Sequence, residues 1–154
     1  IMLKKIISGG QTGVDQAALD TAIRLGIAHG GWVPKGRQTE AGPLSNVYQM
    51  QEMPSEDYAA RTEKNVKDSD GTLIISRGRP TGGTDYTRKM ALKHGKQLLH
   101  IDLSTGQKAS DAGSLINSWI EMNRIEILNV AGPRASNDQS IYNDAANILT
   151  HALK

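Results

Sequence analysis

Short apolar runs alternate with amphipathic helical patterns along this chain, and the alternation constrains its fold more than any other feature. The first run ends at Ile6 and Ile7, and apolar residues between 14 and 25 then recur at helical spacing until Gly26 ends the helix. Such alternation implies parallel pairing of the strands with helices on both faces of the sheet. We therefore predict an α/β, Rossmann-like three-layer fold with a mainly parallel sheet flanked by helices.

The same patterns predict the remaining elements. Further strands are expected near 29–32 and at 72–76, 97–103 and 126–131. Helices are expected at 55–67, with Ser55 as N-cap, and from the end of the loop 77–83 to Gly95. Two more are expected, one with a core face formed by Leu115, Ile116, Trp119 and Ile120 and one over 141–152. Residues 34–54 are expected to form one long loop, of a kind that is usually functional or mobile in compact domains.

Length and charge limit the classes of function. A chain of 154 residues fits one domain, and its 18 Lys and Arg against 16 Asp and Glu give a net charge of only +2. This small, scattered excess argues against a nucleic-acid partner. Segment 1–8 is short, broken by Lys4 and Lys5 and without a cleavage site, and no apolar run approaches the ~20 residues that cross a bilayer. We expect a cytoplasmic protein without a membrane partner.

Three glycine-rich turns follow three of the apolar runs. They are SGGQTG at 8–13, RGRPTGGT at 77–84 and AGPR at 131–134. In a parallel sheet these turns share one edge, where glycine lets backbone N–H groups approach an anion and helix N-termini add positive charge. Tight βα geometry would explain any one turn, but the combination favours a phosphate site. The candidate binding residues are Gly9, Gly10, Gln11, Thr12, Gly13, Lys35, Arg77, Thr81, Gly82, Gly83, Thr84 and Arg134.

Several familiar sites are not supported by the sequence. The first turn does not make G-x-G-x-x-G, and no G-K-[ST] follows it, which argues against a dinucleotide dehydrogenase and a P-loop phosphotransferase. The chain has no cysteine, and its four histidines show no metal-ligand spacing. We expect no metal held by protein ligands.

Other polar and aromatic residues each allow two interpretations. Asp15 lies in the first turn of its helix, where it either favours the helix dipole or contacts a ligand. Lys35 is either a ligand contact or a solvated charge. Arg61 and Asn65 share a helix face and are predicted to be a surface pair, with contacts to the ligand or the long loop as the alternative. Trp32 is predicted to pack in the core rather than stack on a ligand.

Five segments resemble a known family. They are SGGQTGVDQAALD (8–20), GGWVPKGR (30–37), RTEKNVKDSDGTLIIS (61–76), TGGTDYT (81–87) and AGPRAS (131–136). They are similar to the molybdenum (cofactor) carrier family, the circularly permuted branch of the SLOG nucleotide-binding superfamily that includes the lysine-decarboxylase-like LOG proteins. In that superfamily a V-x-G-x-R turn comes first, whereas its counterpart 130–134 comes last here, as a permutation requires. The resemblance implies a Rossmann-like fold, a small phosphorylated ligand and homo-oligomers.

The resemblance also assigns roles within the turns. Gly9 to Gly13 would line one half of the site, and Gly82, Gly83 and Thr84 would form the phosphate cradle with Arg134 opposite. LOG-type hydrolases carry P-G-G-x-G-T-x-x-E, whose glutamate serves the chemistry, but the residues after Gly83 here are TDYTR, without a glutamate. Asp15 or Asp85 would have to take the place of this glutamate, but neither lies at the corresponding position of the motif.

Two functions follow from these observations. The leading hypothesis is a binding protein or carrier for a phosphate-bearing heterocycle, either molybdenum cofactor or a nucleotide derivative. Without cysteine, the chain would hold molybdenum cofactor through its pterin and phosphate only. The alternative is a nucleotide or nucleotide-sugar hydrolase in which Asp15 or Asp85 orients water.

Overall fold

A five-stranded parallel sheet forms the centre of the molecule. The computed structural model describes residues 3–154, so the first two residues of segment 1–8 lie outside it. The strands lie in the order β2-β1-β9-β7-β8, and every neighbouring pair is parallel. Their bounds are β1 Lys5–Ile7, β2 Ala28–Gly30, β7 Gly71–Ser76, β8 Gln97–Asp102 and β9 Ile127–Ala131.

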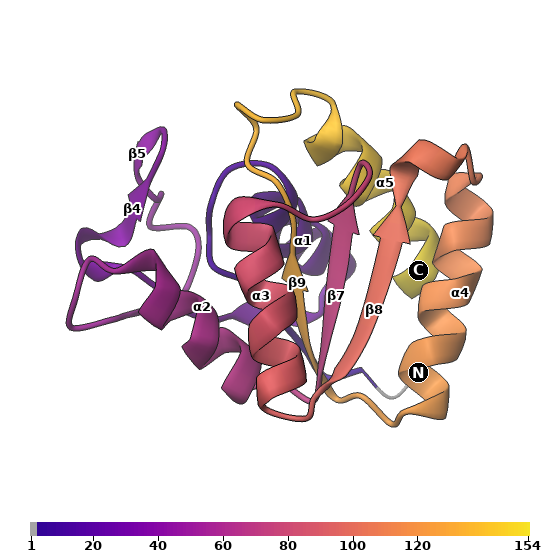
Figure 1. The fold of residues 1–154 in the computed structure, drawn as a ribbon, viewed down its shortest axis with the longest axis horizontal. Helices are drawn as coiled ribbons and strands as arrows, with labels where there is room; N and C mark the ends of the chain where they lie inside the picture. Colours follow the sequence, from indigo (N-terminus) through magenta and orange to yellow (C-terminus); the bar gives the residue numbers. More distant parts are fainter. Residues whose placement is uncertain (1–2) are drawn as a thin grey trace.

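Five helices cover the two faces of this sheet. They are α1 Val14–Leu25, α2 Tyr58–Lys67, α3 Gly82–Lys93, α4 Ala109–Met122 and α5 Ile141–Leu153, with short 3-10 turns η1 Lys35–Arg37 and η2 Leu103–Thr105. Figure 1 shows α2 and α3 in front of the sheet and α1 and α5 behind it. The predicted α/β three-layer fold with a mainly parallel sheet is confirmed. No helix among residues 3–154 combines the length and apolar character needed to cross a membrane.

The helical periodicity produces the larger core. In α1, Val14, Ala18 and Ala22 are fully buried, and Gly26 ends the helix in the left-handed conformation with φ 71°. Apolar residues of α1, α4 and α5 pack against strand residues such as Leu73 in one continuous cluster. The smaller cluster, on the α2 and α3 side, contains only Val66, Met90 and Ala91 as buried members. This second face therefore has room for polar groups.

Strand order places the three glycine turns next to one another. β1 and β9, the first and last strands in the chain, are paired at the centre of the sheet, with Lys5 opposite Ile127. β7 pairs with the other side of β9. The turns after β1, β7 and β9 therefore leave three adjacent strands at the same edge of the sheet.

The segment between β2 and α2 is more ordered than predicted. It contains β3 Trp32–Val33 paired with β6 Gln51–Glu52, and a hairpin of β4 Gln38–Thr39 and β5 Gly42–Pro43. These strands are two residues long, too short to show a periodic pattern. The hairpin stands out beside the main body of the fold, above α2 in Figure 1. The expectation of one loop over 34–54 is therefore wrong in detail.

Three further local predictions are corrected by the structure. The expected strand at 29–32 breaks at Gly31, where φ is +124° and a Cβ would lie 2.3 Å from the Ser8 carbonyl oxygen. Ser55 is not the N-cap of α2, because Asp57 accepts a hydrogen bond from the Ala59 N–H at 2.9 Å and caps it instead. Leu115 does not belong to the core face of α4, since it is 46% exposed.

Candidate functional site

A cavity of about 540 Å³ lies between α2, α3 and the carboxyl end of β9. Residues from all three glycine turns line it: Gly9 and Gln11 from the first, Gly82 to Thr84 from the second, and Ala131 to Arg134 from the third. Its volume falls within the roughly 300–1,000 Å³ of small-molecule sites. The turns that were expected to share an edge thus share one cavity.

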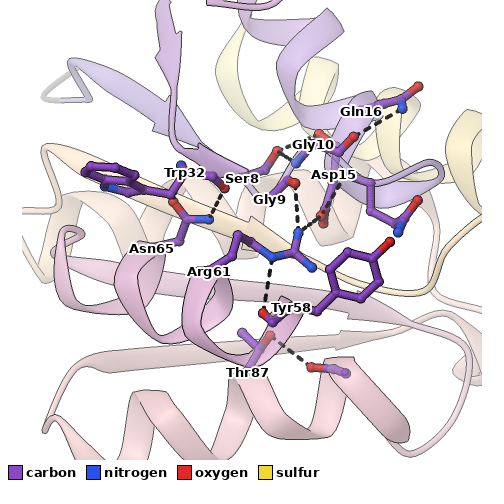
Figure 2. A network of polar contacts seen from close by, with 12 residues as sticks. Ser8, Gly9, Gly10, Asp15, Gln16, Trp32, Tyr58, Arg61, Asn65 and Thr87 are labelled. Carbon is purple, nitrogen blue, oxygen red and sulfur yellow. Dashed lines mark hydrogen bonds and ion pairs between the residues drawn. The ribbon is translucent and has the colours of Figure 1, made fainter. Parts of the chain in front are cut away.

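A buried ion pair joins the first turn to α2. Arg61 Nη1 lies 3.6 Å from Asp15 Oδ2 and donates a hydrogen bond to the Gly9 carbonyl oxygen at 2.7 Å (Figure 2). Asp15 Oδ2 also accepts from the Gln11 N–H at 3.2 Å. Both charged residues line the cavity, and each is less than 10% exposed. The pair fixes the path of the first turn at the inner wall of the cavity.

Burial dominates the electrostatics of this pair. Loss of hydration raises the pKa of Asp15 to about 6, although the Arg61 charge and the Gln11 N–H act in the opposite direction. Loss of hydration likewise lowers the pKa of Arg61, and the Asp15 charge opposes this shift. The cavity wall therefore carries a carboxyl group that changes protonation close to neutral pH.

The glycines of the turns serve two different purposes. A Cβ at Gly9 would lie 1.7 Å from Arg61 Nη1, and one at Gly13 would lie 2.3 Å from the Pro133 carbonyl oxygen. These two glycines allow close packing of protein groups. Among the described residues, nothing lies within 4 Å of a Cβ built at Gly82 or Gly83, both of which line the cavity. The second turn therefore leaves free space beside its glycines on the cavity side.

Positive charge faces the cavity from two sides. Helix α3 begins at Gly82, and the side chain of its N-cap residue, Thr81, makes no capping hydrogen bond. A helix N-terminus carries partial positive charge and free N–H groups. On another wall, the Arg134 guanidinium lies 5.9 Å from the centre of the Tyr58 ring, and Arg61 lies 5.3 Å from that centre. The ion pairs found within residues 3–154 do not include Arg134.

Some candidate residues lie away from this cavity. Arg77 forms ion pairs with Asp138 at 2.9 Å and Asp144 at 2.7 Å, which tie the second turn to the start of α5. Arg77 and Thr81 line a neighbouring polar cavity that shares Thr84 with the first. Lys35 is exposed on η1 and outside the cavity lining.

Three other candidates have contacts inside the protein. Asp85 forms an ion pair with Arg88 at 2.7 Å and is outside the cavity lining. A Cβ at Gly10 would meet Leu44 and Val33 at 2.9 Å, so this glycine faces the segment after β2. The Thr12 hydroxyl accepts from the Ala135 N–H at 3.1 Å, which links the first and third turns.

Comparison with known proteins identifies the family. The profile described as the circularly permutated YpsA SLOG family matches residues 6–153. The chain belongs to this SLOG family. A crystal structure from Syntrophus aciditrophicus SB, of a protein described as a putative molybdenum carrier protein, is 53% identical to the chain, with a TM-score of 0.97 over 99% of this chain and 96% of the other. A search of curated proteins gives no match. The resemblance seen in the sequence is confirmed.

Family membership does not by itself place the cavity residues of this SLOG protein. The surface position predicted for Arg61 and Asn65 is wrong, since they are only 8% and 2% exposed. Asn65 instead holds β3, because its side chain accepts from the Trp32 N–H at 2.8 Å and donates to the Trp32 carbonyl at 3.0 Å (Figure 2). Trp32 lies before the expected loop 34–54, so this bond is not the predicted contact with that loop, whereas Arg61 and Asn65 both line the cavity and a ligand contact stays a prediction. The sequence did contain a signal for their burial: Arg61 and Asn65 lie four residues apart on one face of a helix that has few apolar residues.

Sequence reasoning also missed two residues that line the SLOG cavity, and its prediction for Trp32 was wrong. Tyr58 and Asn129 line it without belonging to a glycine motif. Asn129 is 3% exposed and donates to the Thr72 hydroxyl at 3.2 Å. Trp32 is not in the core: its indole N–H donates to Asp68 at 2.8 Å, and the Lys64 ammonium lies 5.3 Å from its ring centre.

No group of three or more His, Asp or Glu side chains within residues 3–154 is arranged to hold a metal ion. Cytoplasmic location and homo-oligomerisation stay predictions.

Proposed function

We propose that this SLOG protein binds a phosphate-bearing heterocyclic ligand in the cavity between α2 and α3. The single observation that carries the proposal is that the N-terminus of α3 and the Arg134 guanidinium face the same cavity of about 540 Å³. The ligand class is a nucleotide derivative or molybdenum cofactor, and the role is that of a binding protein or carrier.

The phosphate end of the ligand is assigned to the second glycine turn. Gly82 and Gly83 offer open space beside their backbone, so an oxyanion can approach the N–H groups of these two residues at the start of α3. Thr84 lines the cavity beside them. Arg134 supplies a guanidinium, which can form two parallel hydrogen bonds with a phosphate.

The heterocycle is assigned to the inner part of the cavity. Tyr58 offers a ring there, and the neighbouring amide and carboxyl groups of Asn129 and Asp15 can bind the polar edge of a flat heterocycle. The Asn129 and Asp15 side chains are held by hydrogen bonds within the protein, so this part of the site is preformed. A preformed site loses little entropy when it binds.

A carrier role for molybdenum cofactor is supported by the 53% identical relative described as a putative molybdenum carrier protein. The cavity fits the organic part of that cargo, because it combines oxyanion donors with a ring and polar side chains. The chain has no cysteine, so no protein thiolate would bind molybdenum. The cofactor would be held through its pterin and its phosphate.

Ligand binding can be tested with the pure protein. A panel of nucleotides and molybdenum cofactor is screened by thermal shift, because a ligand that binds the folded state raises the midpoint of unfolding. For the ligand found, calorimetry then compares Arg134→Ala with Arg24→Ala, which removes an equal charge from a residue bonded to Thr150. We expect Arg134→Ala to weaken binding about ten- to hundredfold and the control to change it little. No stabilisation by any phosphorylated ligand would end the proposal.

A hydrolase is the second candidate, and one observation favours it. Asp15 lines the cavity and its pKa is raised to about 6 by burial, which suits proton transfer near neutral pH. Asp85 lacks this setting, since Arg88 holds the pKa of its carboxyl below the ordinary value outside the cavity. Chromatography of nucleoside monophosphates would detect release of base or sugar phosphate. Unchanged turnover in Asp15→Asn would refute the assigned role.

A further inference from the structure

The tip of the β4–β5 hairpin is bonded to the rim between the first and third glycine turns. Glu40, at this tip, receives three hydrogen bonds on its carboxylate. Oε2 accepts from the Thr12 hydroxyl at 2.5 Å and the Ser136 N–H at 3.1 Å, and Oε1 accepts from the Ser136 hydroxyl at 2.5 Å. The Glu40 N–H also donates to the Gln11 side-chain oxygen at 2.9 Å.

The groups around this carboxylate match those of an oxyanion site. Two hydroxyls and one backbone N–H converge on a single anionic group, and these hydrogen bonds together with the nearby Arg134 charge lower the pKa of the Glu40 carboxyl. Phosphate and carboxylate are recognised by the same kinds of donor. Ser136 and Arg134 also line the cavity, so the site opens into the proposed ligand pocket.

Among the described residues, the side-chain hydrogen bonds between the hairpin tip and the glycine turns all involve Glu40. Glu40 and Ala41 are exposed, whereas Thr39, next to the tip, and Leu44, directly after β5, are buried. The Thr39 hydroxyl donates to the Gly42 carbonyl and accepts from the Ala41 N–H. Both bonds lie within the hairpin, so they remain intact when the hairpin moves. Displacing the tip therefore breaks the contacts of one residue.

We propose that Thr12 and Ser136 form an oxyanion site, separate from the N-terminus of α3, and that the Glu40 carboxylate occupies this site in place of a ligand anion. An oxyanion, such as a phosphate group that is free or part of the ligand, displaces the Glu40 carboxylate and releases the hairpin tip. This inference deepens the proposed function and rests on it, because it supplies a second anionic position for the same ligand. A ligand with two anionic groups can use both positions.

Calorimetry on two variants tests the competition. Wild type, Glu40→Gln and Glu52→Gln are titrated with inorganic phosphate and, separately, with adenosine 5′-monophosphate. Glu52→Gln removes an equal charge from an exposed residue of β6 and is the matched control. We expect Glu40→Gln to bind at least about fivefold more tightly than wild type, since a like charge no longer occupies the site, and the control to change by less than about twofold. A gain with both probes indicates a site for free oxyanions, and a gain with the nucleotide alone indicates one for a ligand phosphate.

A second variant shows whether the gain belongs to this site. Adding Ser136→Ala to Glu40→Gln removes a hydroxyl donor and should abolish most of the gain, while thermal unfolding verifies that each variant is folded. If folded Glu40→Gln binds neither probe more tightly than wild type does, the inference is wrong while the proposed function stands. If no variant binds either probe, the inference is wrong, and the proposed function is decided separately by the thermal-shift panel of nucleotides and molybdenum cofactor.

Amide hydrogen exchange gives a readout that does not depend on affinity. The Glu40 N–H is bonded to Gln11, so its exchange should accelerate when saturating adenosine 5′-monophosphate displaces the hairpin tip. A hairpin that merely covers the ligand would show slower exchange at Glu40, and this result would overturn the competition.

Discussion

Replacing Asp15 by asparagine measures how much the buried, ionised carboxylate lowers the free energy of unfolding. In the folded state burial raises the pKa of Asp15 from its ordinary 3.8 to about 6. Between these two values the folded state keeps a proton that the unfolded chain has lost. Stability from Asp15 is therefore complete below about pH 4 and is lost as the pH rises through 6.

The size of this effect follows from the two pKa values. One pKa unit corresponds to about 1.4 kcal/mol, so the full loss is about 3 kcal/mol. Of this, about 2 kcal/mol falls between pH 4.5 and pH 8. Asp15→Asn changes the free energy of unfolding by a constant amount through its altered contact with Arg61, but it has no titrating group at this position. The variant should therefore gain about 2 kcal/mol relative to wild type between pH 4.5 and pH 8.

Urea unfolding of both proteins at several pH values measures this difference, and the contributions of the other groups cancel in it. Asp85→Asn is the control, because the pKa of Asp85 is lowered by Arg88 and its stabilising contribution is lost as the pH falls. Because that loss begins only near the ordinary value of 3.8, the difference between Asp85→Asn and wild type should stay nearly constant between pH 4.5 and pH 8. Parallel pH profiles for wild type and Asp15→Asn would refute the assignment of a raised pKa.

Two further changes test the packing around the first turn. Arg61→Met should lower the free energy of unfolding at pH 7.5 by about 3–5 kcal/mol, because buried Asp15 loses its counter-charge; urea unfolding measures this loss, which should shrink in an Asp15→Asn background. Gly13→Ala should lower the midpoint of thermal unfolding more than Gly106→Ala, although φ is positive at both residues. Only the Cβ at 13 would meet the Pro133 carbonyl, at 2.3 Å, and equal losses would contradict this reasoning.

Much of the fold could be predicted because strands and helices longer than about four residues leave a periodic signal. The buried run of β7 and the apolar face of α1 are examples. The strands between 32 and 52 are two residues long, so they could not be recognised. The prediction that Leu115 belongs to the core was wrong for another reason. An apolar residue beside the buried face of a helix can stay exposed, and single exposed apolar residues are normal.

The candidate site was only partly predictable. Parallel strands bring their following turns to one edge, so the meeting of three glycine turns could be expected. The partners of those turns come from elsewhere: Arg61 from α2 and Glu40 from a hairpin tip. Neither has a periodic or motif signal that points to the turn it binds. The division between packing glycines and open glycines likewise depends on neighbours distant in sequence.

The absence of a side chain at Gly9 has a consequence for the evolution of this family. Arg61 Nη1 fills the volume that any larger residue at position 9 would need, and Asp15 depends on that guanidinium for its counter-charge. A larger residue at position 9 would therefore displace the guanidinium and separate it from the Asp15 carboxylate. In divergent relatives a larger residue at position 9 is thus expected together with changes at positions 61 and 15.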